Sequence, residues 1–255
     1  MSIKLTVLGS GTGWPRLERG APGYLLQVAG ENILLDMGPG TIYRLLKAGV
    51  QISEIDGIFL SHFHPDHVTD LIPFFFATRY ALGYKRERPF WLIAGEGFSQ
   101  FHQGLRQAFG HWVDPPEGLM QLQELSTKYP SALLMPPLEI RSAPVVHNPE
   151  SLAYRIEYQG KSLVYSGDTD YAPSLIDLAR GADLLILECA APEGAKVPGH
   201  LTPSLAGQIA GEAQVKRLLL THFYPPCDEA DLIGPCSSHF AGEILLAEDF
   251  LTIEL

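Results

Sequence analysis

The chain has 255 residues, 46% of them hydrophobic, which is enough apolar material for one large domain or two small ones. Its 18 basic and 29 acidic residues give a net charge of -11, which disfavours broad nonspecific binding to nucleic acid. No linker, low-complexity run or internal repeat divides the sequence, so we expect a single domain over residues 1–255.

The N-terminus and the cysteines favour a cytoplasmic protein without a membrane segment. Residues 1–7 lack the long apolar stretch of a signal peptide, and no stretch reaches membrane-spanning length. The three cysteines are odd in number and lack zinc-ribbon spacing, so we expect reduced thiols at Cys189, Cys227 and Cys236.

The first predicted strand, Lys4–Gly9, runs into a glycine-rich turn, Gly-Ser-Gly-Thr-Gly-Trp-Pro at residues 9–15. Its GxGxG spacing differs from the GxGxxG of dinucleotide sites, and Pro15 and Pro22 leave no uninterrupted helix to receive a pyrophosphate. We favour a tight loop between strands, with backbone N–H groups facing an anionic substrate as the alternative.

A hairpin is expected next, over Tyr24–Ala29 and Asn32–Asp36. Its second strand ends in the carboxylate of Asp36, which could cap the helix predicted over Thr41–Ala48.

Residues 61–68, Ser-His-Phe-His-Pro-Asp-His-Val, follow the apolar run Gly57–Leu60, which predicts a short buried strand. Pro65 prevents the strand from continuing, so the histidines should lie on the loop at its C-terminal end, where α/β proteins usually place their chemistry. Imidazole and carboxylate groups together suit a divalent ion such as zinc, manganese or iron. One ion cannot easily use four side chains of so short a loop, so we expect two adjacent ions. One of them would face His62 and His64, and the other would face Asp66 and His67.

The segment His62-Phe63-His64-Pro65-Asp66-His67 resembles the HxHxDH signature of the metallo-β-lactamase superfamily. The resemblance implies an α/β fold, a four-layer αββα sandwich, with a one- or two-metal site at one edge of its two sheets. It also implies that Asp36 supports the metal loop without binding metal, a role that is compatible with capping. The glycine-rich turn and the pair Arg19-Gly20 resemble the opening of the ribonuclease Z branch of this superfamily.

A helix is predicted over Val68–Tyr80, with Phe74, Phe75 and Phe76 on its inner face. Asp70 departs from the small residue that the family usually has there, so it could cap a helix or hydrogen-bond locally. Residues 84–88, Tyr-Lys-Arg-Glu-Arg, are expected to form a solvated surface turn. A strand over Phe90–Ala94 and a helix over residues 97–109 should follow.

Three later strands each end next to a residue that could bind metal. The first is predicted over Leu138–Val146 and is followed by His147. The second, over Lys161–Ser166, forms a hairpin with Leu152–Tyr158 and is followed by Asp168. The third, over Val215–Leu220, is the last core strand and is followed by His222. The resemblance implies that His147 completes the histidines of the first metal, Asp168 bridges both metals and His222 is the last ligand.

Residues 183–189 predict a buried strand with Glu188 near its end, where a charge is costly to bury without a partner. His200 follows, and Thr202 and Pro203 mark the N-cap and first residue of a helix to Ala213. Glu188 and His200 resemble the pair that handles the leaving-group proton in ribonuclease Z. The alternative is a hydrogen bond that merely ties the strand to the helix.

The resemblance therefore implies seven metal ligands and three catalytic residues. His62, His64 and His147 would bind one ion, Asp66, His67 and His222 the other, and Asp168 would bridge them; Asp66, Glu188 and His200 would act in catalysis. Two zinc ions, with manganese or iron as alternatives, could hold a shared water whose pKa falls from about 15.7 to about 7.

The interval between His147 and Asp168 shapes the expected substrate. Only 21 positions separate them, whereas ribonuclease Z proteins that process transfer RNA carry a long arm in this interval. We expect a phosphodiesterase acting on small phosphodiesters or cyclic nucleotides, without a membrane partner and with nucleic acid not favoured. A tRNA 3′-processing endonuclease is the first alternative, because a partner subunit, for instance in a homodimer, could supply the arm. A lactonase or β-lactamase type of hydrolase and a non-catalytic metal-binding scaffold are the others.

Overall fold

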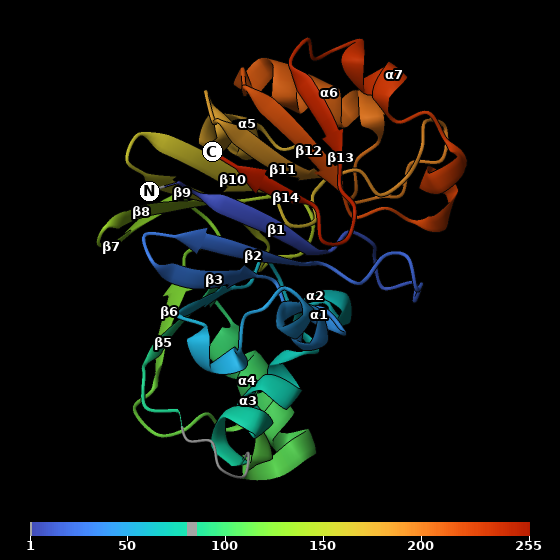
Figure 1. Ribbon diagram of the computed structural model, residues 1–255. Helices are drawn as coiled ribbons and strands as arrows, with labels where there is room; N and C mark the ends of the chain where they lie inside the picture. Colours follow the sequence, from blue (N-terminus) through green and yellow to red (C-terminus); the bar gives the residue numbers. More distant parts are fainter. Residues whose placement is uncertain (1, 81–85) are drawn as a thin grey trace.

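The computed structural model describes residues 2–80 and 86–255, in which two seven-stranded sheets pack against each other (Figure 1). The first sheet has the order β14-β1-β2-β3-β4-β5-β6 and the second the order β13-β12-β11-β10-β9-β8-β7. In sheet order, the strands of the first are Thr252–Glu254, Lys4–Gly9, Gly23–Val28, Glu31–Leu35, Gly57–Phe59, Phe90–Gly95 and Met120–Leu125. Those of the second are Glu243–Leu246, Arg217–Thr221, Leu184–Glu188, Lys161–Tyr165, Leu152–Tyr158, Leu138–Pro144 and Ser131–Met135.

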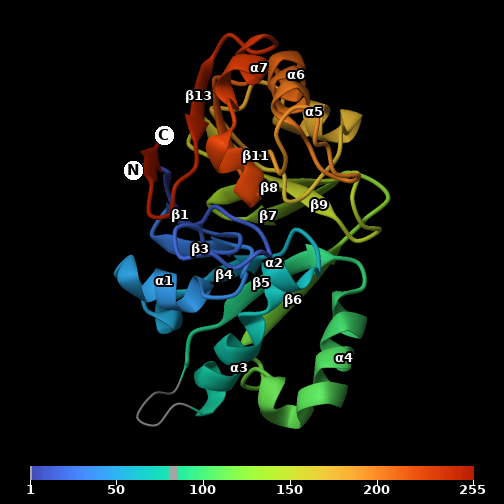
Figure 2. The same ribbon diagram turned by 90° about the vertical axis from the view of Figure 1, so that its right-hand side faces the viewer.

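Helices cover the outer faces of both sheets, with α1 to α4 on the first and α5 to α7 on the second (Figures 1 and 2). They span Thr41–Lys47, Pro65–Val68, Leu71–Tyr80, Phe98–Phe109, Pro173–Ala179, Pro203–Ala213 and Ile233–Ser237. Short 3₁₀ turns occupy Ile52–Glu54, Gly110–Val113 and Pro225–Glu229. The order of layers is therefore helix, sheet, sheet, helix, which confirms the αββα sandwich expected from the sequence.

Each sheet is antiparallel in one half and parallel in the other. Strands β14 to β3 and β7 to β10 pair antiparallel, whereas β3 to β6 and β10 to β13 pair parallel. Parallel neighbours point their C-terminal ends to the same edge, and loops that leave this edge can bring side chains from several strands together.

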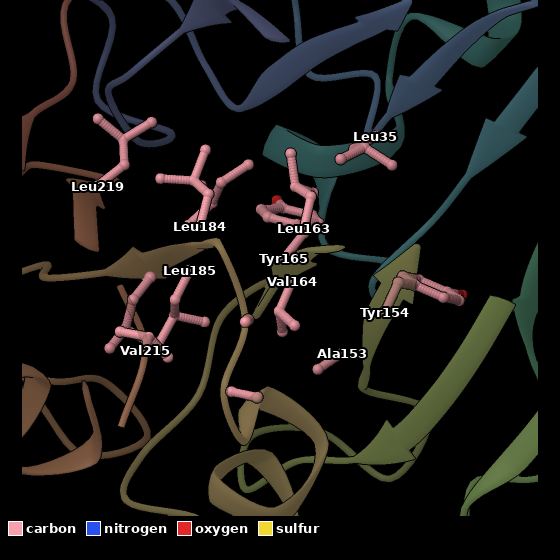
Figure 3. Close-up of a cluster of buried hydrophobic side chains, with 14 of the residues drawn as sticks. Leu35, Ala153, Tyr154, Leu163, Val164, Tyr165, Leu184, Leu185, Val215 and Leu219 are labelled. Carbon is pink, nitrogen blue, oxygen red and sulfur yellow. The ribbon is translucent and has the colours of Figure 1, made fainter. Parts of the chain in front are cut away.

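Both faces of the parallel strands β4, β10, β11 and β12 are buried over most of their length, so their central residues form apolar runs rather than alternating with polar residues. In β10, Leu163 lies toward Leu35 of the first sheet, while the next residue, Val164, points toward the outer helices (Figure 3). Strand β10 thus contributes side chains both to the core between the sheets and to the core under the helices. Packing on both faces holds the strand in place, and with it the strand end that carries site residues.

Replacing Leu163 with alanine should lower the free energy of unfolding by about 2–5 kcal/mol, because the fully buried side chain would leave a cavity between the sheets. Denaturant titration followed by circular dichroism measures the change. Leu134→Ala is the control, since Leu134 is 76% exposed and its truncation should change the same quantity by no more than about 0.5 kcal/mol. Equal effects in the two variants would contradict the assignment of Leu163 to the core.

Several sequence predictions about the elements were only partly right. The helix expected over Val68–Tyr80 begins at Leu71 as α3, while Val68 ends the short helix α2. Between them, the Asp70 carboxylate accepts hydrogen bonds from the N–H groups of Gly40 and Ile42 and so caps α1. Phe76 is 47% exposed, while Phe74 and Phe75 are buried as expected. β12 is the last strand that is mostly buried, as expected, and β13 pairs beside it as a partly exposed edge strand. Thr202 occupies the N-cap position of α6 without a capping hydrogen bond from its side chain, within the residues that the structure describes.

The charged segment 84–88 also differs from expectation. Tyr84 and Lys85 lie outside the described residues, but Arg86 is only 3% exposed and is therefore no solvated surface residue. Its guanidinium donates hydrogen bonds to the backbone carbonyls of Ile52, at 3.0 Å, and Ile55. Because several carbonyls surround it, the buried charge is hydrogen-bonded rather than isolated.

Within residues 2–80 and 86–255, no helix is both long and apolar enough to cross a membrane.

Candidate metal centre

The predicted metal-binding residues meet at the edge where strands of both sheets end. The segment after β4 carries the first four of them, but only His62 and His64 lie on the expected loop, because Asp66 and His67 belong to the short helix α2. Single residues follow β8, β10 and β12.

These segments are far apart in sequence, but their side chains form three overlapping groups, within each of which the potential ligand atoms all lie within 4.8 Å of one another. The first two groups hold the predicted ligands, with His62, His64, His147 and Asp168 in one and Asp66, His67 and His222 in the other. In the third, His200 joins Asp168 and His222.

Asp168 faces the first two groups with different oxygens. Its Oδ2 lies 3.7 Å from His62 Nε2, whereas its Oδ1 lies 3.3 Å from both His67 Nε2 and His222 Nε2. A carboxylate in this position can bridge two cations, one on each oxygen. Asp168 therefore lies between the two groups of predicted ligands, and its role as a bridge stays a prediction.

Several buried polar atoms at this edge lack hydrogen-bond partners among the described residues. They are His62 Nε2, His67 Nε2, both ring nitrogens of His222 and Asp168 Oδ1. Buried polar atoms nearly always have hydrogen-bond partners or ligands in folded proteins, so this cluster indicates a binding site for a ligand. Burial, together with the nearby His67, lowers the pKa of His62 and favours the neutral imidazole that binds metal. The donor set fits divalent cations such as zinc.

Asp36 orients the loop that carries the histidines. This fully buried carboxylate accepts hydrogen bonds from the Ser61 N–H and hydroxyl and from His67 Nδ1, each at 2.7 Å, and from the Tyr165 hydroxyl. His67 is thereby held with Nε2 toward the cluster. The supporting role expected for Asp36 fits these contacts, whereas α1 begins after Gly40 and is capped by Asp70 instead.

Glu188 and His200 form the expected pair beside the cluster. Glu188 Oε1 accepts from His200 Nδ1 at 2.9 Å, and its carboxylate also accepts from the N–H groups of Thr169 and Leu201. These bonds explain why the charge can be buried at the end of β11. Burial would lower the pKa of His200, but the hydrogen bond and charge of Glu188 outweigh it and the pKa is raised.

His200 also belongs to the site by position. Its ring stacks on His222, with 5.5 Å between the ring centroids, and lies 4.9 Å from that of His147. One of its nitrogens falls within 4.8 Å of ligand atoms of Asp168 and His222. Since Glu188 engages Nδ1, Nε2 is the nitrogen that can reach a bound substrate.

The glycine-rich turn lies against this site. A Cβ atom on Gly13 would sit 3.4 Å from the Asp66 side chain, so the turn forms one wall. Two of its backbone N–H groups donate to other parts of the fold, that of Gly11 to the Gly20 carbonyl and that of Ser10 to the Asp249 carboxylate. These contacts favour the tight loop over an anion cradle.

Three residues with a part in this site escaped the sequence reasoning. Ser61 and Tyr165 both donate to the Asp36 carboxylate, and Asp249 accepts from the N–H groups of Ser10, in the glycine-rich turn, and of Gly20, which follows the turn. Ser61 could have been suspected from its place beside the histidines. The other two carry no local signal, because their partners lie more than 100 positions away.

Comparisons with known proteins agree with this arrangement. The family model described as Beta-lactamase superfamily domain matches residues 31–223. Ribonuclease Z of Mycobacterium sp. (strain KMS) is 26% identical, and the alignment covers 99% of this chain and 96% of that protein. The probable metallo-hydrolase YhfI of Bacillus subtilis (strain 168) is 29% identical over 96% of this chain and 97% of that protein.

Solved structures share the whole fold. The crystal structure of YhfI from Bacillus subtilis has a TM-score of 0.85 at 26% identity and covers 100% of both chains. A diphosphatase from the PhnP family has a TM-score of 0.72 at 22% identity, with 100% of this chain and 98% of that chain covered. The sequence match, the shared fold and the clustered donors together show that the chain belongs to the metallo-β-lactamase superfamily of metal-dependent hydrolases, in its ribonuclease Z-like branch.

Proposed function

We propose that the protein is a phosphodiesterase that hydrolyses small or cyclic nucleotide phosphodiesters with two divalent metals, zinc in the first place and manganese or iron as alternatives. The observation that carries the proposal is the Glu188–His200 pair, whose imidazole reaches the same space as the potential ligands Asp168 and His222. Hydrolysis of a lactam or lactone would not need this pair.

The proposed ligands are the seven residues of the first two groups. His62, His64 and His147 would hold the first metal, Asp66, His67 and His222 would hold the second, and Asp168 would take part in both sites. When bound, the two cations lower the pKa of a shared water toward about 7, supply hydroxide at neutral pH and stabilise the charge that develops on the phosphorus oxygens. Asp66 can accept a hydrogen bond from that water.

His200 then provides the proton for the leaving group. As water oxygen bonds to phosphorus, the bond from phosphorus to the departing alkoxide breaks, and the Nε2 proton of His200 passes to that alkoxide. Glu188 stabilises the protonated imidazole before the transfer and fixes its orientation through Nδ1. General acid catalysis of this kind contributes typically about 10²–10⁴-fold.

The short interval between His147 and Asp168 supports a small substrate. It contains a tight turn, β9 and β10, all within the described residues, and both strands lie inside the second sheet between β8 and β11. No segment projects from this interval to grip a folded RNA. The net charge of -11 likewise gives no general attraction to polyanions.

A tRNA 3′-processing endonuclease is the second candidate, and the similarity to ribonuclease Z over 99% of the chain favours it. In that case a second subunit, for instance in a homodimer, would provide the grip on RNA. Sedimentation with and without precursor tRNA would test for such an assembly.

Turnover of a substrate panel tests the proposed function. Zinc- or manganese-loaded protein should hydrolyse bis(p-nitrophenyl) phosphate and at least one cyclic nucleotide, and a chelator should abolish both activities. Preference for precursor tRNA over every small phosphodiester would establish the second candidate instead. No metal-dependent turnover of any phosphodiester would reject the proposal.

Replacing Glu188 with glutamine should shift the alkaline limb of the kcat/KM profile to lower pH. Glu188 raises the pKa of His200, so the protonated imidazole persists to higher pH in the wild type than in the variant. The pH profile with bis(p-nitrophenyl) phosphate measures this shift. An unchanged alkaline limb would mean that His200 is not the acid.

A further inference from the structure

Asp170 ties together three segments that each carry a residue of the metal centre. It lies two positions after Asp168, and its own N–H donates to the Val146 carbonyl at 2.7 Å, next to His147. Its side chain reaches the loop that precedes His200. The sequence suggests only a cap or turn residue at this position, because none of these partners is local.

The two carboxylate oxygens of Asp170 accept hydrogen bonds from different donors. Oδ1 accepts from the N–H of Tyr171 at 2.8 Å, which is a local turn contact. Oδ2 accepts from the Gly199 N–H at 3.3 Å and from Lys196 Nζ at 2.6 Å. The second oxygen therefore anchors the loop of residues 196–199 to the strand end that carries Asp168.

Gly199 connects the anchored loop to His147. Its carbonyl accepts a hydrogen bond from His147 Nδ1 at 3.0 Å, which leaves His147 Nε2 facing His64 Nδ1 at 3.1 Å. Gly199 has a φ of +80°, and a Cβ atom there would lie 3.1 Å from His147 Nδ1. Only glycine fits this close approach without strain, so the position of the Gly199 peptide determines the position of the His147 imidazole.

We propose that Asp170 is a positioning residue for the metal centre, which acts through Gly199 to hold His147 with Nε2 toward the first metal. The inference rests on the ligand roles in the proposed function. Partners that orient a ligating histidine typically change metal affinity about 10–100-fold when they are removed. Lys196 contributes less, because its ion pair with Asp170 is partly exposed to solvent, which weakens the attraction between the two charges.

Zinc affinity tests the proposal independently of activity. Competition between metal-free protein and a chromophoric chelator gives the dissociation constant of each bound zinc. Asp170→Ala should weaken one of two zinc ions about 10–100-fold and leave the other largely unchanged. Asp170→Ser should behave like Asp170→Ala, because serine can keep the local contact with Tyr171 but is too short for Gly199.

Asp183→Ala is the matched control. Like Asp170, Asp183 accepts from a backbone N–H and from a lysine, here Ser162 at 2.9 Å and Lys216 at 2.7 Å, and it also accepts from the Ser162 hydroxyl at 3.3 Å. It precedes β11, at the end opposite to Glu188, so its loss should leave both zinc affinities unchanged. Unchanged zinc affinity in both Asp170 variants, or an equal loss in the control, would overturn the proposal.

A second measurement needs no metal. In metal-free protein, the His147 Nδ1–H that donates to Gly199 should give a slowly exchanging imidazole proton signal, and both Asp170 variants should lose its protection. Retention of this protected signal in the variants would overturn the proposal. If zinc affinity and this signal respond as expected while no phosphodiester is hydrolysed, the proposed function fails and the positioning role of Asp170 stands.

Discussion

Replacing His200 with alanine should reduce kcat for bis(p-nitrophenyl) phosphate by about 10²–10⁴-fold while both metals stay bound. The expected loss follows from the position of the imidazole, held by Glu188 at 2.9 Å and stacked on His222. Steady-state kinetics gives the rate, and metal analysis of the same preparation gives the occupancy.

His102→Ala is the control for this variant. His102 packs on Phe98 within α4, and its Nε2 contacts the Val113 carbonyl at 3.0 Å, so it is a structural histidine away from the ligand groups. Its removal should leave kcat close to that of the wild type. If His200→Ala lost metal in proportion to activity, His200 would be a ligand rather than a proton donor.

Replacing Asp36 with alanine should weaken zinc binding by about 10–100-fold and lower the free energy of unfolding by about 3 kcal/mol or more. Both effects have one cause. The variant leaves the hydroxyls of Ser61 and Tyr165 and the Nδ1–H of His67 buried without their acceptor. Chelator competition measures the affinity, and denaturant unfolding of the metal-free protein measures the stability.

Asp56→Ala separates the two effects. Asp56 is a similarly buried carboxylate at the opposite end of β4, where it accepts from the Asn32 N–H at 2.9 Å and pairs with Arg88. Its removal should destabilise the protein without changing zinc affinity. Normal zinc affinity in Asp36→Ala would show that the histidine loop keeps its geometry without this carboxylate.

The site chemistry could be predicted because it is encoded at strand ends. Each apolar run stops at a proline, glycine or polar residue, and the next side chain is a potential ligand or acid, as in His147, Asp168 and His222. Such runs need only local apolar and β-forming patterns, which are legible in one sequence. The fold class and the family predicted on this basis are confirmed.

Elements without a clear local pattern could not be predicted. β6 and β7 were missed, and the burial of β7 alternates between half-buried and exposed residues, so its place at a sheet edge depends on pairing with β8. The sequence indicated that Arg86 is exposed to solvent, because charged side chains usually are. Its burial depends on carbonyl groups of residues 52–55, which only the folded chain brings to it.

The sequence by itself determined which donor groups exist and that each stands at the end of a strand, because strand formation and its interruption by proline or glycine are local properties. Only the tertiary structure decided how these donors face one another. The two oxygens of Asp168 turn to different histidine groups, Asp36 gathers Ser61, His67 and Tyr165, and Asp170 reaches His147 through Gly199. These contacts join segments about 25 to 130 positions apart, and the packing of two sheets against each other sets their geometry.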